Sequence, residues 1–191
     1  ALWLQPDAAR QHFEFILESL RELYLALKQR GGRLHVVTGD VLEVLTRIYD
    51  QAPFQCLCAH EETGNAWTYQ RDLAVAQWCQ AHQVNYLEFR QFGVVRRLAD
   101  RDHWKASWDA HVEQLCLPIP PHMQFVEMHW QDALPPSASR LQLMQPDPPR
   151  RQVGGRQAGL ALLSSFLYER GAYYRGGISS PLSAPDACSR L

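Results

Sequence analysis

The sequence has no apolar run long enough to cross a bilayer, and its first residues lack the charged and apolar regions of a secretory signal peptide. Cysteine is scarce, because 191 residues contain only five, an odd number found in apolar or helical surroundings. This usage predicts reduced thiols and argues against a disulfide framework. We therefore expect a soluble cytoplasmic protein with no membrane partner, long enough to bury a hydrophobic core.

The chain also lacks an excess of charge and the common catalytic motifs. Nineteen Lys and Arg residues face twenty Asp and Glu residues, so the net charge of −1 does not indicate that the whole domain binds nucleic acid. No G-x-G-x-x-G motif or P-loop follows a predicted strand, and no nucleophile elbow or H-E-x-x-H helix is present. These absences disfavour the usual dinucleotide, triphosphate and hydrolase sites.

Helices and strands alternate in the first half of the chain. Helices are predicted at residues 7–30, 41–51 and 66–83, and strands at residues 33–40, 54–60 and 84–89. Strict alternation with short connections predicts an α/β fold, a Rossmann-like parallel sheet covered by helices. We expect Val36, Val37, Leu57 and Cys58 to be buried on its central strands.

The second half has a different composition. Residues 91–115 form a helix-like segment, residues 118–149 hold most of the prolines, and a helical period returns over residues 154–174. We predict an α/β domain at residues 1–117, an interdomain linker at 118–150, and the first helix of an all-α domain within 151–191. Gly154-Gly155 follows no strand, so its predicted role is to break the linker.

Loops that follow parallel strands are where open α/β sheets bind ligands. Gly39-Asp40 and His60 to Asn65 lie at that edge of the predicted sheet. Glu61 and Glu62 could accept hydrogen bonds from a ligand there. Asn65 could meet an anion, although a plain helix cap is the favoured interpretation.

Two further groups of residues could carry chemistry. Cys56, Cys58 and His60 alternate on one face of a predicted strand, but a metal site would need another ligand, and small buried thiols explain the pattern better. The terminal "CSRL" places a hydroxyl, a guanidinium and backbone N–H groups after a proline-punctuated loop. Such a set suits a phosphate or pyrophosphate.

Four stretches taken in order resemble the photolyase/cryptochrome flavoprotein family, particularly its bacterial members. They are "FILESLRELYLALKQRGGRLHVVTGD", "HEETGNAWTYQRDLAVAQWCQ", "FGVVRRLADRDHWKASW" and "GGRQAGLALLSSFLYERGAYYRGGISSPLSAPDACSRL". The last stretch is similar to the entry of the family's flavin-binding helical domain, in which "CSRLSPYL" wraps the FAD phosphates. The family's arginine-rich first strand and most of its helical domain have no counterpart here, so we expect the chain to be a fragment that does not retain FAD alone.

The resemblance implies a role for the whole protein. It implies an α/β antenna domain and a helical domain that holds FAD and uses blue light to drive electron transfer, as a deoxyribodipyrimidine photolyase does on damaged DNA. By position in the motif, Tyr174, Cys188, Ser189 and Arg190 are the candidate FAD-binding residues. Damaged DNA would be the partner, through the helical domain. An antenna chromophore is possible, but the asparagine-glutamate pair that holds folate in some photolyases is absent near Trp67-Thr68.

Two alternatives remain open at this point. One is a cryptochrome-type blue-light photoreceptor, which would share the fold and the flavin. The other is a nucleotide- or flavin-binding α/β module without photochemistry, because a fold alone does not fix a function.

Overall fold

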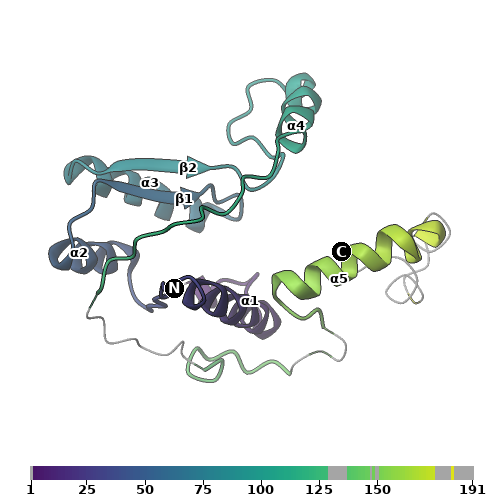
Figure 1. Cartoon of the computed structure of the whole chain (residues 1–191), viewed down its shortest axis with the longest axis horizontal. Coiled ribbons are helices and arrows are strands. Elements are labelled where there is room, and N and C mark those ends of the chain that lie inside the picture. The colour runs from purple at the N-terminus through teal and green to yellow at the C-terminus, as the bar shows by residue number, and fades with distance from the viewer. Residues whose placement is uncertain (1, 129–136, 147, 149–150, 175–181, 183–191) are drawn as a thin grey trace. The chain divides into compact units, whose positions relative to one another are not determined.

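The computed structural model describes residues 2–128, 137–146, 148, 151–174 and 182. The chain divides into two compact units, which are described separately: Trp3–Val36 with Asp132–Leu191, and Val37–Gln131. The elements in chain order are η1 (Leu2–Leu4), α1 (Arg10–Lys28), α2 (Val41–Gln51), β1 (Cys56–His60), α3 (Ala66–Ala81), β2 (Asn85–Phe89), η2 (Arg101–His103), α4 (Trp104–Val112), α5 (Arg156–Tyr168) and η3 (Arg170–Tyr173) (Figure 1).

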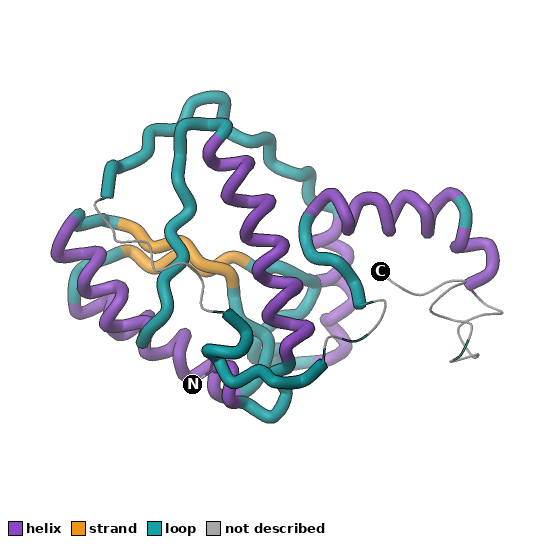
Figure 2. The backbone as a smooth tube through the Cα atoms, turned by 90° about the horizontal axis from the view of Figure 1, so that it is seen from below, coloured by secondary structure: helices purple, strands orange, loops and turns teal. Residues whose placement is uncertain are grey.

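The unit formed by Val37–Gln131 is built on a β-α-β motif. Strands β1 and β2 pair in parallel with Leu57 opposite Tyr86, and α3 connects them (Figure 2). Such a crossover is the elementary unit of parallel α/β sheets. The predicted α/β fold class with a parallel sheet is therefore confirmed.

One face of the two strands packs on helices. Leu45 from α2 and Val75, Trp78 and Cys79 from α3 form a buried cluster with Val84. Leu57 and Tyr86, which are half-buried, pack against this cluster from the same face of the sheet. The Trp78 indole N–H donates to Thr46 Oγ1 at 2.9 Å, so the polar atom of the largest side chain in the cluster has a partner.

The other face of the strands is exposed to solvent. Cys56 and Cys58 of β1 lie on it. On β2, Leu87 lies opposite Cys58, and Phe89 lies opposite His60. The expectation that Cys58 would be buried is wrong, because side chains alternate along a strand and the core face of β1 takes Leu57 instead.

The strand predicted at residues 33–40 is not formed. Within the described part of the chain the sheet contains only β1 and β2, and residues 33–39 run as an irregular segment in which Val36 and Val37 are half-buried. Valine favours a strand only where a neighbouring strand pairs with its backbone, and no such neighbour is present among the described residues.

The predicted boundaries hold best where a cap fixes them. Asp40 accepts hydrogen bonds from the backbone N–H groups of Leu42 and Glu43, and α2 begins at Val41 as predicted.

The helix predicted over residues 91–115 is wrong for its first part. Arg97 has a φ of 55°, and Asp100 caps the short turn η2, so regular α-helix starts only at Trp104.

The unit formed by Trp3–Val36 and Asp132–Leu191 centres on α1. Phe13 of α1 is buried with Ala138 and Leu143, and Trp3, Leu17 and Leu141 pack against this second cluster. Helix α5 lies in the same unit and has no buried side chain along its length. No helix in the described part of the chain combines the length and the apolar composition that a membrane span requires.

Candidate functional site at the strand ends

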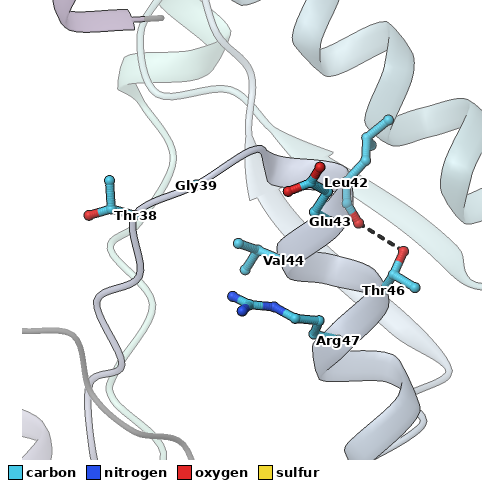
Figure 3. Close-up of a pocket in the computed structure, with 7 residues that line it drawn as sticks. All are labelled: Thr38, Gly39, Leu42, Glu43, Val44, Thr46 and Arg47. Carbon is cyan, nitrogen blue, oxygen red and sulfur yellow. Dashed lines mark hydrogen bonds between the residues drawn. The ribbon is translucent and has the colours of Figure 1, made fainter.

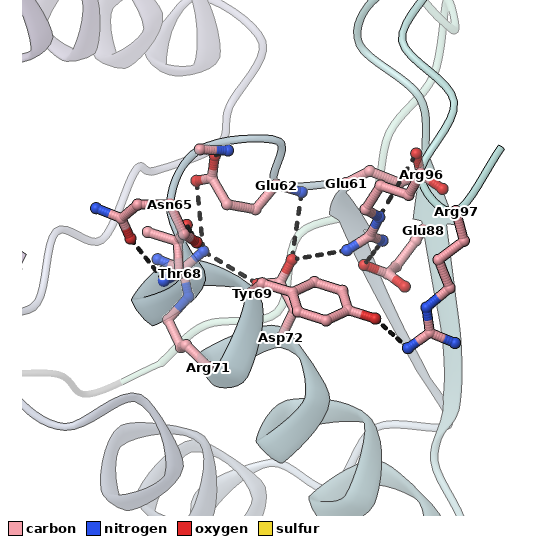
Figure 4. A network of polar contacts seen from close by, with 11 residues as sticks. Glu61, Glu62, Asn65, Thr68, Tyr69, Arg71, Asp72, Glu88, Arg96 and Arg97 are labelled. Atoms are coloured by element: carbon pink, nitrogen blue, oxygen red, sulfur yellow. Dashed lines mark hydrogen bonds and ion pairs between the residues drawn. The ribbon is translucent and has the colours of Figure 1, made fainter. Parts of the chain in front are cut away.

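Polar side chains gather where β1 and β2 end and α3 begins (Figure 4). We call this group the strand-end network. Its members are Glu61, Glu62, Asn65, Thr68, Tyr69, Arg71, Asp72, Glu88, Arg96 and Arg97. The position agrees with the ligand-binding edge that the sequence predicts.

Asp72 is the buried centre of the network. Its carboxylate accepts a hydrogen bond from the Glu62 backbone N–H at 3.2 Å, so it holds the loop after β1 against α3. It also lies 3.1 Å from an Arg71 nitrogen and 3.3 Å from an Arg96 nitrogen. A buried carboxylate requires such partners, because removing an unpaired charge from water is costly.

Arg96 connects three carboxylates from three parts of the chain. One nitrogen lies 2.5 Å from Glu88 on β2, another 3.3 Å from Asp72 on α3, and Nε lies 3.7 Å from Glu61 in the loop after β1. Burial acts to lower the pKa of Arg96, but the hydrogen bond and charge of Glu88, followed by Glu61 and Asp72, raise it above its ordinary value. The guanidinium is therefore a permanent charge that fastens the loop, the helix and the strand together.

Two tyrosines lie beside these charges. The Tyr69 ring lies 5.8 Å from the Arg96 guanidinium carbon and 5.5 Å from that of Arg97, and Arg97 also donates a hydrogen bond to the Tyr69 hydroxyl. Burial, together with the negative charges of Glu88 and Asp72, raises the pKa of Tyr86 to about 12. Tyr86 therefore remains a neutral phenol next to the network at ordinary pH.

The acidic loop at residues 60–65 folds back on itself. Glu62 accepts a hydrogen bond from the Gly64 N–H at 2.9 Å and lies 3.6 Å from Arg71. Asn65 caps α3 by accepting from the Thr68 N–H at 3.1 Å, which confirms the favoured interpretation of this residue. The loop carboxylates contact groups of the protein itself.

The strand-end network does not fit the phosphates of a dinucleotide. Its guanidinium groups on Arg71 and Arg96 contact carboxylates already, and four carboxylates, Glu61, Glu62, Asp72 and Glu88, share the edge. An added phosphate would meet negative charge there and would displace existing ion pairs. The arrangement suits the joining of loop, strand and helix better than the binding of an anion.

A shallow cavity of about 600 Å³ lies beside the start of α2 (Figure 3). It is lined by Thr38, Gly39, Leu42, Glu43, Val44, Thr46 and Arg47. Asp40 caps α2, so Gly39 is the residue of the predicted Gly39-Asp40 edge that lines the cavity. Glu43 and Arg47 give the lining charges of both signs.

The four residues predicted to bind FAD fall in two places. Tyr174 follows η3, and its ring packs edge-on against Phe166 of α5 with 5.7 Å between ring centroids. Cys188, Ser189 and Arg190 lie outside the described residues. The structure therefore places Tyr174 against the carboxyl-terminal part of α5.

Sequence reasoning missed the residues at the centre of the network. Asp72 had a readable signal, since it shares one face of its predicted helix with Val75 and Cys79, and Glu88 lies between Leu87 and Phe89 on a predicted strand, so each carboxylate near the core requires a cation nearby. Arg96 and Arg97 lay inside a segment that was predicted as helix. Their role as loop residues depends on the turn at Arg97, which has a positive φ that its own side chain does not favour.

The thiols on β1 form a close pair. Cys56 and Cys58 are exposed, with 3.8 Å between their sulfur atoms, so the interpretation as buried thiols is wrong, although their placement on one face of the strand is confirmed. Among the described residues, no three His, Cys, Asp or Glu side chains lie close enough together to hold a metal ion.

Comparison with known protein families gives a match over the α/β part of the chain. The DNA photolyase family model matches residues 3–97. Over 75 residues, the chain is 35% identical to Cryptochrome-1 of Anopheles gambiae and 31% identical to Cryptochrome-1 of Aedes aegypti. These matches cover 39% of this chain and 14% of each cryptochrome.

Solved structures extend the likeness along the chain. A bacterial class III photolyase from Agrobacterium tumefaciens matches 91% of this chain with a TM-score of 0.65 at 17% identity, and the chain covers 39% of that protein. An archaeal photolyase from Sulfolobus tokodaii, whose crystal structure contains two FAD molecules, matches 81% with a TM-score of 0.53 at 20% identity, and 35% of it is covered. Identities at this level establish the fold. The family model shows in addition that residues 3–97 of this chain belong to the DNA photolyase family, to which the cryptochrome matches and the fold also point.

Proposed function

We propose that this chain is the amino-terminal portion of a light-driven FAD flavoprotein, a DNA photolyase that repairs UV-induced pyrimidine lesions by photoinduced electron transfer. The observation that carries the proposal is the fold likeness to the class III photolyase, because it extends over most of the chain and includes both of its compact units. Members of the photolyase family bind FAD. In this proposal FAD supplies the excited electron, and damaged DNA is the partner of the helical domain.

The residues of this chain have two separate tasks in the proposed protein. The β1-α3-β2 unit is the α/β domain, with its strand-end edge closed by the ion pairs around Arg96. The segment after α5 leads to the flavin. Tyr174 would line the approach to the cofactor, and Cys188, Ser189 and Arg190 would hold its phosphates through a hydroxyl, a guanidinium and backbone N–H groups.

The antenna is a separate question within this proposal. The strand-end edge is filled by ion pairs, and this argues against an anionic antenna chromophore bound directly over Asp72. The archaeal photolyase contains two FAD molecules, so a flavin is the first chromophore to look for. Chromatography of the cofactors released from the denatured whole protein would identify FAD and any second chromophore.

The deciding experiment uses the whole protein whose reading frame contains this chain. It is incubated with an oligonucleotide that carries one cyclobutane thymine dimer, under blue light and in the dark, and restored thymines are quantified by chromatography. We expect repair in the light only. Repair that requires no light, or a whole protein that contains no flavin, would overturn the proposal.

A cryptochrome-type photoreceptor is the second candidate, and the sequence identity to the two mosquito cryptochromes favours it. The same experiment separates the two. Photoreduction of bound FAD without restoration of thymines would identify the photoreceptor. An Arg190→Ala variant that loses FAD on dialysis, beside a Glu62→Ala variant that keeps it, would support the predicted phosphate loop in either case.

A further inference from the structure

One surface of α1 contacts the start of α5 through a series of hydrogen bonds, within a single compact unit. Glu18, Ser19 and Glu22 project from adjacent turns of α1, and we call them the α1 acceptor face. Each of the three accepts a hydrogen bond from a different backbone N–H: those of Gly154, Gly155 and Gln157.

Glu18 makes the strongest of these contacts. Its two carboxylate oxygens accept from Arg151 at 2.5 and 2.9 Å, and one of them also accepts from the Gly154 N–H at 2.7 Å. The paired arrangement of guanidinium and carboxylate is the geometry that gives ion pairs both strength and direction. The Glu18 and Arg151 side chains are only 23% and 18% exposed, so solvent screens the pair incompletely.

The two neighbouring residues satisfy the first turn of α5. Ser19 Oγ accepts from the Gly155 N–H at 3.0 Å, and the Glu22 carboxylate accepts from the Gln157 N–H at 3.1 and 3.2 Å. The first N–H groups of a helix have no acceptor within the helix, and α5 has no side-chain cap of its own. Residues of α1 therefore provide the cap that α5 lacks, and a carboxylate there is also favoured by the helix dipole.

The glycines in this contact allow the close approach. A Cβ atom on Gly154 would collide with the Phe15 carbonyl oxygen, and one on Gly155 would collide with the Glu22 carboxylate. Gly155 also has a φ of 109°, which favours glycine. The expectation that this pair only breaks the linker is thus incomplete, because both residues touch α1.

We infer that the α1 acceptor face is a docking site for residues 151–157, which fastens the end of the proline-rich segment and sets the position of α5. No side chain of α5 is fully buried, and Leu162 and Phe166 are half-buried, so apolar packing around the described residues of this helix is incomplete. Leu163, Leu167 and Tyr168 are 42%, 63% and 83% exposed. The hydrogen bonds and the ion pair from α1 lie at the amino end of the helix.

Amide hydrogen exchange measured by NMR on the whole chain tests the inference, because each donor has its own acceptor. Docking as a unit predicts that Glu18→Gln accelerates exchange at Gly154, Gly155 and Gln157 together, by about tenfold. The control is Glu14→Gln, whose residue pairs with Arg10 on the same helix and should change none of the three. Acceleration at Gly154 alone, or at none of them, would overturn the docking site.

Two further measurements cover the case in which a variant folds poorly. Raising the salt concentration of the unmodified chain should accelerate the same three amides, because it screens the ion pair. Gly154→Ala, which leaves every charge in place, should speed tryptic cleavage after Arg151 several-fold, read by mass spectrometry. Three amides insensitive to salt, or cleavage unchanged in Gly154→Ala, would contradict docking.

Discussion

Arg96 lies 3.3 Å from Asp72 although 24 residues separate them in the sequence, and this contact joins the loop after β2 to the buried side of α3. It places a charged group next to the core without leaving it unpaired. Such an arrangement makes each partner dependent on the other.

Removing Asp72 should therefore destabilise the Val37–Gln131 unit strongly. Asp72→Ala leaves the Glu62 N–H without its acceptor and removes one of the three carboxylates around Arg96, and we expect a loss of about 3 kcal/mol in the free energy of unfolding. Urea denaturation followed by circular dichroism measures it. Asp109→Ala is the matched control, because its exposed pair with Lys105 should contribute less than about 1 kcal/mol. Equal losses in the two variants would show that Asp72 is not the centre of the network.

Truncation should separate the buried core from the solvent face of β1. Leu45 is 9% exposed and lies in the cluster with Trp78, so Leu45→Ala should cost about 2–5 kcal/mol. Cys58→Ala, on the solvent face of the strand, should change the free energy of unfolding by less than about 0.5 kcal/mol. A large loss from Cys58→Ala would mean that this face is covered in solution.

The cap at the start of α2 offers a graded test. Asp40→Ala removes the acceptor for the Leu42 and Glu43 N–H groups and should cost about 1 kcal/mol. Asp40→Asn keeps an acceptor oxygen and should lose only part of that amount. Thermal melting of both variants gives the comparison. If Asp40→Asn lowered the thermal midpoint as much as Asp40→Ala does, the charge of Asp40, and not its hydrogen bond, would be the stabilising feature.

Glu18 should give the Arg151 contact a dependence on pH. The hydrogen bond from Arg151, aided by that of the Gly154 N–H and by the charges of Arg151 and Arg21, holds the pKa of Glu18 at about 2, below the ordinary 4.5. Burial opposes this shift. Because the folded-state pKa is the lower one, the contribution is fully present above pH 4.5 and is lost as the pH falls toward 2.

The measurement is the difference in the free energy of unfolding between the unmodified chain and Glu18→Gln across that range. The difference should reach at most about 3 kcal/mol at neutral pH and shrink on acidification. Using a difference removes the titration of the other carboxylates. A difference that stays constant from neutral pH down to pH 2 would show that Glu18 carries no charge-dependent contact.

Much of the fold could be predicted from local pattern, and the failures have a common cause. The apolar periodicity of α1 and the cap at Asp40 are written in neighbouring residues, so α1 and α2 appear close to where they were expected. The strand at residues 33–40 failed because a strand depends on a partner that may lie anywhere in the chain, and valines at 36 and 37 carry no information on it.

The candidate site was predictable only as a location. The edge where β1 and β2 end follows from the strand-helix-strand order, but the pairing of Arg96 with Glu61, Asp72 and Glu88 depends on four segments meeting in space. The contact of Glu18 with Arg151 is harder still, since 133 residues separate them. Single residues of this kind show their role only through their partners.

The burial of Cys79 offers a way to follow how the β1-α3-β2 motif opens in solution. It is 1% exposed, whereas Cys56, Cys58 and Cys116 are open to solvent, and burial raises the pKa of its thiol. A thiol reagent in excess should therefore label the sulfurs of Cys56, Cys58 and Cys116 promptly and reach Cys79 only when α3 separates from the strands. The rate at which Cys79 is labelled therefore measures how often the β1-α3-β2 motif opens. Mass spectrometry can follow this rate in the unmodified chain.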